Sequence, residues 1–573
     1  MRGRFWVAAL AAASPILLFG AVIGTRAFAQ ATATAEDAAD PNAGGATPAE
    51  QAAQPEAMPA PAGPAAASAP AEGATEPAGT PPATTTVQTV AIPAAATPVV
   101  EAIRAQLADP ALRAKANPND LAALLAFYNG RSEPVWTTDM GFSREGQDAI
   151  DEILGADDWG LSSATFSLPS SGKLPSSVDD QARFEIELDL AVLKYARHAR
   201  GGRTDPARLS KLYGMTPTLR DPKVVLTEIA AAGEPDIYLQ SLHPKHEQFQ
   251  LLRQALVKAR GEGEAGAKSA KTQKIVVNME RWRWMPEDLG SLYVLLNIPA
   301  FDVHVVRDGK PVYADKIVVG ELKYATPVFA ADLQSVVFNP EWTVPPTIVR
   351  ENLLPSLRGG GGFFGGGTAV LKKHELNVYY NGKRVDPSSI NWTSVNMAAI
   401  SFRQAPSPKN VLGKVKFVYP NPYSVYMHDT IKKGLFDKEL RAEGHHCPRV
   451  GNPGKIAAVI LAQDQNMPQA EVDKLLASGY NSGVKLNHRV RVLTAYFTAV
   501  ADDQGKVTTH ADLYRIDPPV AAALLGSEAR PEAVADNTAP AVEPKPKPQA
   551  QPKPSTVGSA APAPAAGFAA AQP

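Results

Sequence analysis

The chain has 573 residues, with 57 Lys and Arg against 58 Asp and Glu, and it contains a single cysteine. A formal net charge of −1 gives no basic surface for nucleic-acid phosphates, so we expect no such partner. The lone cysteine excludes an internal disulfide, and the length allows roughly two to four domains.

The first residues predict export. Two arginines precede an apolar stretch from residue 5 to about residue 24, and Ala27 and Ala29 are small residues of the kind that signal peptidase accepts. We expect a signal peptide over residues 1–29 and a place in the periplasm or cell envelope. Because the apolar stretch is almost long enough to span a bilayer, an uncleaved membrane anchor is the alternative.

Low-complexity arms flank the part of the chain that is expected to fold. Residues 30–98 and 526–573 are rich in Ala and Pro and poor in large apolar residues. Such segments cannot bury enough surface to offset the entropy of ordering. We predict a disordered linker and a disordered tail, which serve as wall-spanning tethers or as solubilising arms.

Residues 99–273 show helical periodicity and predict a helical scaffold domain. Asp120 is placed to cap one helix, whose apolar side runs through Leu121, Leu124, Leu125 and Tyr128.

A second apolar stripe recurs at helical spacing: Phe184, Leu188, Ala191, Val192 and Tyr195. Glu185 and Glu187 are interpreted as the solvated side of this helix. The composition of residues 261–273 is typical of a linker.

From residue 274 the pattern changes to short β-prone runs, as at residues 293–298 and 303–306. Asp308-Gly309 and Asn381-Gly382 favour tight hairpins because these residues tolerate positive φ. We predict a β-rich domain over residues 274–525 and an α+β protein overall.

A glycine-rich segment near residues 358–368 surrounds Phe363 and Phe364. No Gly-Lys-Ser/Thr follows it, so it is not a phosphate-binding loop. Long loops in compact domains are often functional lids. This segment is therefore either a loop that closes over a ligand or an insertion without catalytic importance.

The residues that point to chemistry lie between His428 and Cys447, where three of the ten histidines accompany the only cysteine. A thiol needs a base to become a nucleophilic thiolate, and His428 or His445 can supply it. The alternative is a buried, inert thiol that packs as a small apolar side chain. His445, His446 and Cys447 are consecutive, whereas zinc ligands are usually spaced apart, so we expect no metal and no cofactor.

Several short motifs occur in order along the second half of the chain: NMERWRWMP at 278–286, TPVF at 326–329, FNPEWTVP at 338–345, KNVLG at 409–413, HDT at 428–430, LF at 435–436, RA at 441–442, CPRV at 447–450, YFT at 496–498 and DLY at 512–514. Together they resemble the L,D-transpeptidases, and most closely the large, multi-domain YcbB-like branch of the YkuD-type fold. The resemblance covers about residues 100–518.

The resemblance implies a cysteine acyltransferase that acts on peptidoglycan stem peptides. Cys447 would attack the carbonyl of diaminopimelate, the third residue of a tetrapeptide stem, and form a thioester. An amine of a second stem, or of an envelope protein, would resolve the thioester, giving a 3→3 cross-link in the first case. His428 would be the general base and acid.

The same resemblance implies an oxyanion site at the main-chain N–H groups of His446 and Cys447, within a loop that includes Gly444 and His445. The substrate-binding residues that it implies are Arg449, Tyr426, Trp342, Phe363 and Phe364.

The chain departs from the family pattern next to the cysteine. His446 stands where the family has glycine, Gly444 stands where it has serine, and Pro448 replaces an apolar residue. Glycine permits positive φ, so a histidine there is expected to clash or to misdirect the oxyanion donor. A peptidoglycan-binding repeat ahead of the motif at 278–286 is also missing.

These departures keep two alternatives open, a non-catalytic wall-binding protein and an L,D-carboxypeptidase that uses water as the acceptor. A further hypothesis is that an imidazolium at His428 lowers the pKa of Cys447.

Overall fold

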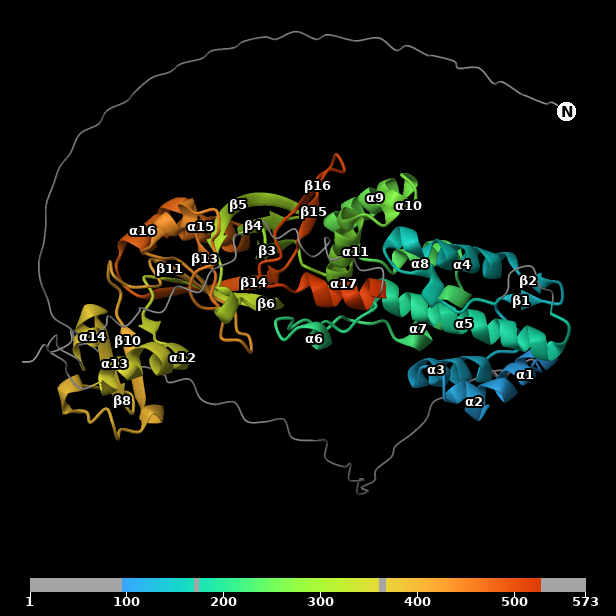
Figure 1. Ribbon diagram of the computed structural model, residues 1–573, viewed down its shortest axis with the longest axis horizontal. Helices are drawn as coiled ribbons and strands as arrows, with labels where there is room; N and C mark the ends of the chain where they lie inside the picture. Colours follow the sequence, from blue (N-terminus) through green and yellow to red (C-terminus); the bar gives the residue numbers. More distant parts are fainter. Residues whose placement is uncertain (1–94, 170–174, 360–366, 527–573) are drawn as a thin grey trace, which may run out of the picture. The chain divides into compact units, whose positions relative to one another are not determined.

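The structure is a computed structural model, and it describes residues 95–169, 175–359 and 367–526 (Figure 1). The predicted signal peptide, nearly all of the predicted linker, Phe363, Phe364 and residues 527–573 lie outside the described residues. Within the described ranges, no helix combines the length and the apolar character needed to cross a bilayer.

The N-terminal half is helical, as the sequence predicts. Its helices are α1 (Pro98–Leu107), α2 (Pro110–Arg113), α3 (Pro118–Asn129), α4 (Arg144–Leu154), α5 (Val178–Gly201), α6 (Pro206–Leu209), α7 (Pro222–Ala230), α8 (Pro235–Ser241), α9 (Glu247–Gly261), α10 (Glu264–Ala267) and α11 (Ala270–Arg283). A short hairpin, β1 (Thr137–Thr138) and β2 (Gly141–Phe142), lies between α3 and α4.

The start of α3 differs from the prediction. Asn117 is its N-cap, with its side chain accepting from the main-chain N–H groups of residues 119 and 120, and a proline opens the helix. Asp120 is instead buried in the first turn, where it forms an ion pair with Arg197 at 2.9 Å. Leu125 is exposed, so the apolar side of this helix is narrower than predicted.

Helix α5 buries the predicted stripe, but the prediction for Glu185 is wrong. Phe184, Leu188, Val192 and Tyr195 are all buried. Glu185 is fully buried too, because α5 is covered on more than one side by α1, α3, α4, α7 and α8. Its carboxyl group is satisfied by hydrogen bonds from the turn that precedes β1.

The predicted linker at residues 261–273 is also wrong, because α10 and the start of α11 occupy it. The motif at residues 278–286 includes the buried end of α11. There Arg281 forms a buried ion pair with Asp517 at 2.5 Å and donates to Tyr213 and Thr498. We read this motif as a structural junction rather than as a catalytic element.

The strands of the β-rich domain begin at Leu292, later than predicted, and eight of them close into a barrel in the order β11-β12-β13-β5-β4-β3-β14-β6. Their bounds are β3 (Leu292–Asn297), β4 (Asp302–Arg307), β5 (Lys310–Val318), β6 (Phe329–Phe338), β11 (Val415–Val418), β12 (Met427–His428), β13 (Arg449–Val450) and β14 (Ser482–Ala495). The interior is filled by alternate apolar side chains such as Val294, Val303, Ile317, Val336 and Phe417.

The predicted tight turns are confirmed. Asp308 and Gly309 have φ of 48° and 77° in the β4–β5 turn, and Asn381 and Gly382 have φ of 47° and 77° between β8 (Leu376–Tyr380) and β9 (Lys383–Val385). A further hairpin, β15 (Ala499–Ala501) with β16 (Val507–Thr509), turns near Gly505, whose φ is 72°.

A smaller sheet, β7-β10-β8-β9, forms a separate cap with its own apolar core around Phe402 and Trp392. Its remaining elements are β7 (Trp342–Thr343), α12 (Pro346–Ile348), the π-helix η4 (Val349–Leu353), α13 (Leu354–Arg358), α14 (Ala369–Lys373) and β10 (Ile400–Gln404). Helices α15 (Pro453–Gln465), α16 (Gln469–Ala477) and α17 (Asp517–Leu525) complete the described elements.

Candidate active site

Strand register brings the cysteine and the first histidine of the motif to one face of the barrel. His428 in β12 pairs with Arg449 in the parallel strand β13, and the His428 N–H donates to the Pro448 carbonyl at 3.1 Å. Because side chains alternate along a strand, Tyr426 and Cys447 lie two residues earlier on the same face. The Tyr426 main-chain N–H hydrogen-bonds the Cys447 sulfur.

This face points out of the barrel and is covered by neighbouring segments. Val415, Phe417 and Met427 point inward and are completely buried. His428 is also buried, whereas Cys447 is partly exposed. The nucleophile can therefore be reached while its neighbouring histidine is shielded from water.

The hypothesis that His428 lowers the pKa of Cys447 is wrong in this structure. Burial raises the pKa of the Cys447 thiol, and the Tyr426 N–H, Lys416 and Arg449 only partly oppose that rise. Burial and the charges of Arg449 and Lys416 lower the pKa of His428 to about 3. The resting pair is therefore a neutral thiol beside a neutral imidazole.

The hydrogen bond at His428 fixes its tautomer. The Nδ1 atom bonds the Asp429 carbonyl oxygen, which can only accept, so Nδ1 carries the proton. The other ring nitrogen, Nε2, is then unprotonated and free to act as a base. No hydrogen bond joins the His428 ring to the Cys447 sulfur among the described residues, as is common in free enzymes before substrate binds.

The loop before the cysteine accommodates its histidines. The positive φ lies at Gly444, 99°, while His446 is absent from the residues with positive φ in the described chain. His446 Nδ1 bonds the Ala325 carbonyl at 2.8 Å, and its own carbonyl accepts from the Thr326 hydroxyl at 2.8 Å. The predicted clash at His446 is therefore wrong.

The main-chain N–H groups of His446 and Cys447 have no hydrogen-bond acceptor within the described parts of the chain. Two adjacent free donors beside a nucleophile suit the developing oxyanion of an acyl transfer.

Gly444 is required by two constraints. Its φ is in the left-handed region, and a Cβ at this position would lie 2.4 Å from the Arg449 Nη2 atom. Arg449 also donates to the Glu443 carbonyl at 3.3 Å. These contacts show Arg449 bracing the loop, whereas the resemblance implied that it binds substrate.

His445 lies on the cap side of the same loop. Its ring stacks on Tyr324 with centroids 4.0 Å apart, and the Tyr324 hydroxyl donates to Glu351 in the π-helix η4. Burial and the neighbouring His446 lower the pKa of His445. These contacts link the loop to the cap and place His445 in a structural position rather than as the partner of the thiol.

Trp342 and Tyr426 meet between the cap and the barrel. Trp342 lies in β7 and hydrogen-bonds the Tyr426 side chain, while the Tyr426 and His428 ring centroids are 5.6 Å apart. Tyr426 is therefore close to the nucleophile, and Trp342 contacts Tyr426; their role in substrate binding stays a prediction.

Sequence reasoning missed two residues, Lys416 and Tyr419. Lys416 in β11 pairs with His428, and its Nζ lies 4.2 Å from the centroid of the Tyr426 ring. Tyr419 is buried, and its hydroxyl has no partner among the described residues; burial and the nearby Cys447 raise its pKa. Only the barrel register brings Lys416 to the site, so no local motif could have identified it.

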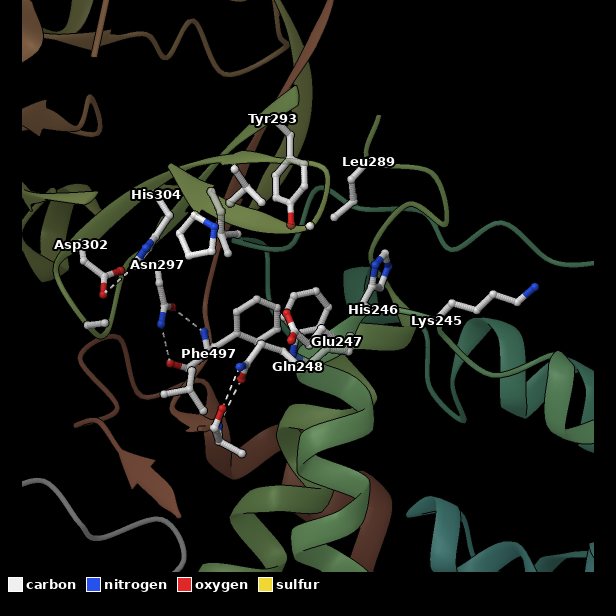
Figure 2. A pocket seen from close by; sticks show the side chains of 18 of the residues that line it. Lys245, His246, Glu247, Gln248, Leu289, Tyr293, Asn297, Asp302, His304 and Phe497 are labelled. Carbon is white, nitrogen blue, oxygen red and sulfur yellow. Dashed lines mark hydrogen bonds and ion pairs between the residues drawn. The ribbon is translucent and has the colours of Figure 1, made fainter. Parts of the chain in front are cut away.

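A cavity of about 620 Å³ lies elsewhere, between the start of α9 and the β3–β4 hairpin (Figure 2). His246 and Gln248 face Tyr293, Asn297 and Phe497 across it, and Cys447 is not among its lining residues. We therefore assign no part of the acyl-transfer chemistry to this cavity. No group of three or more metal-ligating side chains occurs within the described ranges.

Comparison with known proteins identifies two domains in this chain. Residues 291–463 match the family model described as "L,D-transpeptidase catalytic domain", and residues 122–256 match the one described as "Scaffold domain". A "Putative L,D-transpeptidase" of Haemophilus influenzae (strain ATCC 51907 / DSM 11121 / KW20 / Rd) is 30% identical over 248 residues, which are 43% of this chain and 48% of that protein. The chain thus spans about half the length of the curated relative that it matches.

A solved structure, "Structure of the Ldtfm-avibactam carbamoyl enzyme", is 10% identical and covers 36% of this chain and 50% of its own, with a TM-score of 0.18. At that score the likeness carries no weight for fold or function.

Proposed function

Because the chain carries an L,D-transpeptidase catalytic domain of the YkuD type behind a Scaffold domain, we propose that it forms 3→3 cross-links in peptidoglycan. Cys447 is the nucleophile, and the donor is a tetrapeptide stem. The observation that carries the proposal is the shared face of β12 and β13, where Cys447, an unprotonated His428 and two free main-chain N–H groups lie together.

The first half-reaction forms the thioester. His428 Nε2 takes the thiol proton as the sulfur attacks the carbonyl carbon of the third stem residue. The N–H groups of His446 and Cys447 stabilise the oxyanion. When the intermediate collapses, the peptide C–N bond breaks, and the D-Ala amine leaves with the proton from His428.

The second half-reaction transfers the acyl group. The acceptor amine attacks the thioester and gives its proton to His428, and the C–S bond breaks as the thiolate leaves and recovers that proton. A neutral resting pair suits this cycle, because the base must be unprotonated before each attack. The acceptor is a diaminopimelate amine of a second stem; an amine of an envelope protein is the other candidate.

We also propose that the protein acts outside the cytoplasm, exported by residues 1–29. Peptidoglycan stems are available there, and the Ala- and Pro-rich composition of residues 30–98 suits a wall-spanning tether.

The test is the intact mass of the full chain after incubation with a carbapenem, a β-lactam class that acylates such cysteines. A stable adduct on the wild type that is absent from Cys447→Ala is expected. A folded wild type that forms no adduct would contradict a working nucleophile and favour the wall-binding alternative.

A second incubation, with disaccharide tetrapeptide, separates the activities. Cross-linked dimer with release of D-Ala supports the transpeptidase. Tripeptide without dimer would instead identify the L,D-carboxypeptidase.

A further inference from the structure

Lys416 is a half-buried cation beside the nucleophile without an anionic partner. It lies on β11 directly opposite His428, on the outward face that also carries Tyr426 and Cys447. No carboxylate or other hydrogen-bond acceptor pairs with its ammonium within the described parts of the chain. Burial lowers its pKa, and the interaction with a thiolate at Cys447 opposes this shift.

The other cations near the site each have an acceptor within the protein. Arg449 donates to the Glu443 carbonyl and packs against Gly444. Lys433 forms an ion pair with Asp429 at 2.5 Å and donates to the Gly451 carbonyl at 3.0 Å. Lys416 therefore differs from its neighbours in having an ammonium without a hydrogen-bond acceptor among the described residues.

Removing an ammonium from water is costly unless an anion or a strong acceptor replaces the lost hydration. The Tyr426 ring, at 4.2 Å, offsets part of this cost through a cation–π contact. A ring face accepts no strong hydrogen bond, so the three ammonium donors still need acceptors. An anion carried by the substrate would meet that need at the reacting centre.

We propose that Lys416 binds a carboxylate at the reacting end of the donor substrate and so aligns the scissile carbonyl with Cys447. The inference rests on the proposed function, because the donor is taken to be a tetrapeptide stem. Two carboxylates of that stem lie near the scissile bond, the C-terminal one of the leaving D-Ala and the free one of diaminopimelate. Both have the same chemistry, and the experiment distinguishes them.

The first experiment does not depend on stem activity. Iodoacetate and iodoacetamide alkylate a thiol by the same reaction, in which the new C–S bond displaces iodide, but only iodoacetate carries a carboxylate. The ratio of their rate constants on Cys447, normalised to the ratio on free cysteine, measures attraction of a carboxylate to the site. Any change in the pKa of Cys447 affects both reagents equally and cancels from the ratio.

We expect Lys416→Met to lower this ratio about tenfold, the scale of a charge interaction at a partly buried position, and Lys416→Arg to restore most of it. Lys485→Met is the matched control. It removes the same charge from an exposed position on β14, which is not adjacent to β11, β12 or β13, and it should leave the ratio unchanged. A ratio in Lys416→Met equal to that of the wild type, with folding confirmed by circular dichroism, overturns the inference.

The second experiment identifies the carboxylate. Thioester formation is measured with the free tetrapeptide stem, with its C-terminal amide and with the form amidated at diaminopimelate. One of the two amidated substrates lacks the carboxylate that Lys416 binds. Its kcat/KM should be the same with the wild type and with Lys416→Met, whereas kcat/KM for the other two substrates should be about tenfold lower with the variant. Equal losses with all three substrates would overturn carboxylate recognition.

If the wild type reacts with no stem, the proposed function fails, and the alkylation ratio alone decides whether Lys416 forms a carboxylate site. If stems react but the ratio does not depend on Lys416, the proposed function stands and the carboxylate site is refuted.

Discussion

A buried pair of carboxyl groups in the scaffold should make its stability depend on pH. The Tyr128 hydroxyl lies 3.0 Å from a Glu185 oxygen and 2.7 Å from an Asp189 oxygen. One hydroxyl proton cannot serve both acceptors, so a second proton must lie on one of the carboxyl groups. Burial raises the pKa of Glu185 as well, but hydrogen bonds from the Trp136 main-chain N–H and the Thr137 hydroxyl oppose that rise. Asp189 therefore holds the proton.

Burial and the charge of Glu185 raise the pKa of Asp189 to about 8. In the unfolded chain an aspartate titrates near ~3.9. Between these values the folded state binds one proton that the unfolded state lacks, so the free energy of unfolding falls as pH rises, by about 1.4 kcal/mol per pH unit. From pH 5 to pH 7 the loss due to Asp189 is about 2.7 kcal/mol.

Asp189→Asn should remove this dependence. In the wild type the Trp136 indole N–H donates to Asp189 at 2.7 Å. In the variant the same N–H can donate to the amide oxygen, and the amide N–H can donate to Tyr128. We expect the difference in the free energy of unfolding, variant minus wild type, to rise by about 2.7 kcal/mol between pH 5 and pH 7. Equilibrium unfolding in urea at pH 5, 6 and 7 measures this difference, and groups common to both proteins cancel.

Asp179→Asn is the matched control, because Asp179 is exposed on the same helix. Its stability relative to the wild type should change by less than about 0.5 kcal/mol over the same range. A constant difference between Asp189→Asn and the wild type from pH 5 to pH 7 would refute the proton assigned to Asp189.

Three further predictions concern the active site. Because His428 has a pKa of about 3, its basic form persists well below pH 6.5. The rate of carbapenem acylation of Cys447, measured by stopped flow, should therefore not fall between pH 7 and pH 5. A tenfold loss of rate per pH unit below pH 6.5 would indicate a histidine with an ordinary pKa. His446→Gly should give no faster acylation, since the loop already holds His446 without positive φ, and a tenfold gain in the same assay would mean that the histidine does misplace the oxyanion donor. Gly444→Ala should lower the free energy of unfolding by about 1–3 kcal/mol through backbone strain. It should also slow acylation, because the added Cβ displaces Arg449. An unchanged thermal unfolding midpoint would contradict the need for a left-handed residue at this position.

The features that the sequence predicted correctly are mainly those with local causes. Asp308-Gly309 and Asn381-Gly382 form the expected turns because positive φ is a property of the residues themselves. The β-prone runs of β3 and β4 and the apolar stripe of α5 are short local patterns that a single sequence displays.

The features that were missed depend on contacts between distant segments. Glu185 flanks an apolar stripe and reads as solvated, yet α5 is covered on several sides, which periodicity on one helix cannot show. Lys416 reaches the site only because β11 pairs with β12 in a register that places it opposite His428. In both cases a long-range arrangement, rather than the residue's own preference, determines its surroundings.

The position of the left-handed residue also bears on how such enzymes are recognised from sequence. In this chain the backbone reverses at Gly444, and the side chain of His446 is held by the segment around Ala325 and Thr326. A search pattern that demands glycine immediately before the cysteine would therefore reject this protein, although its loop supplies free donors at the same place. A pattern built on the histidine, the cysteine and the arginine two residues after it would retain sequences of this kind.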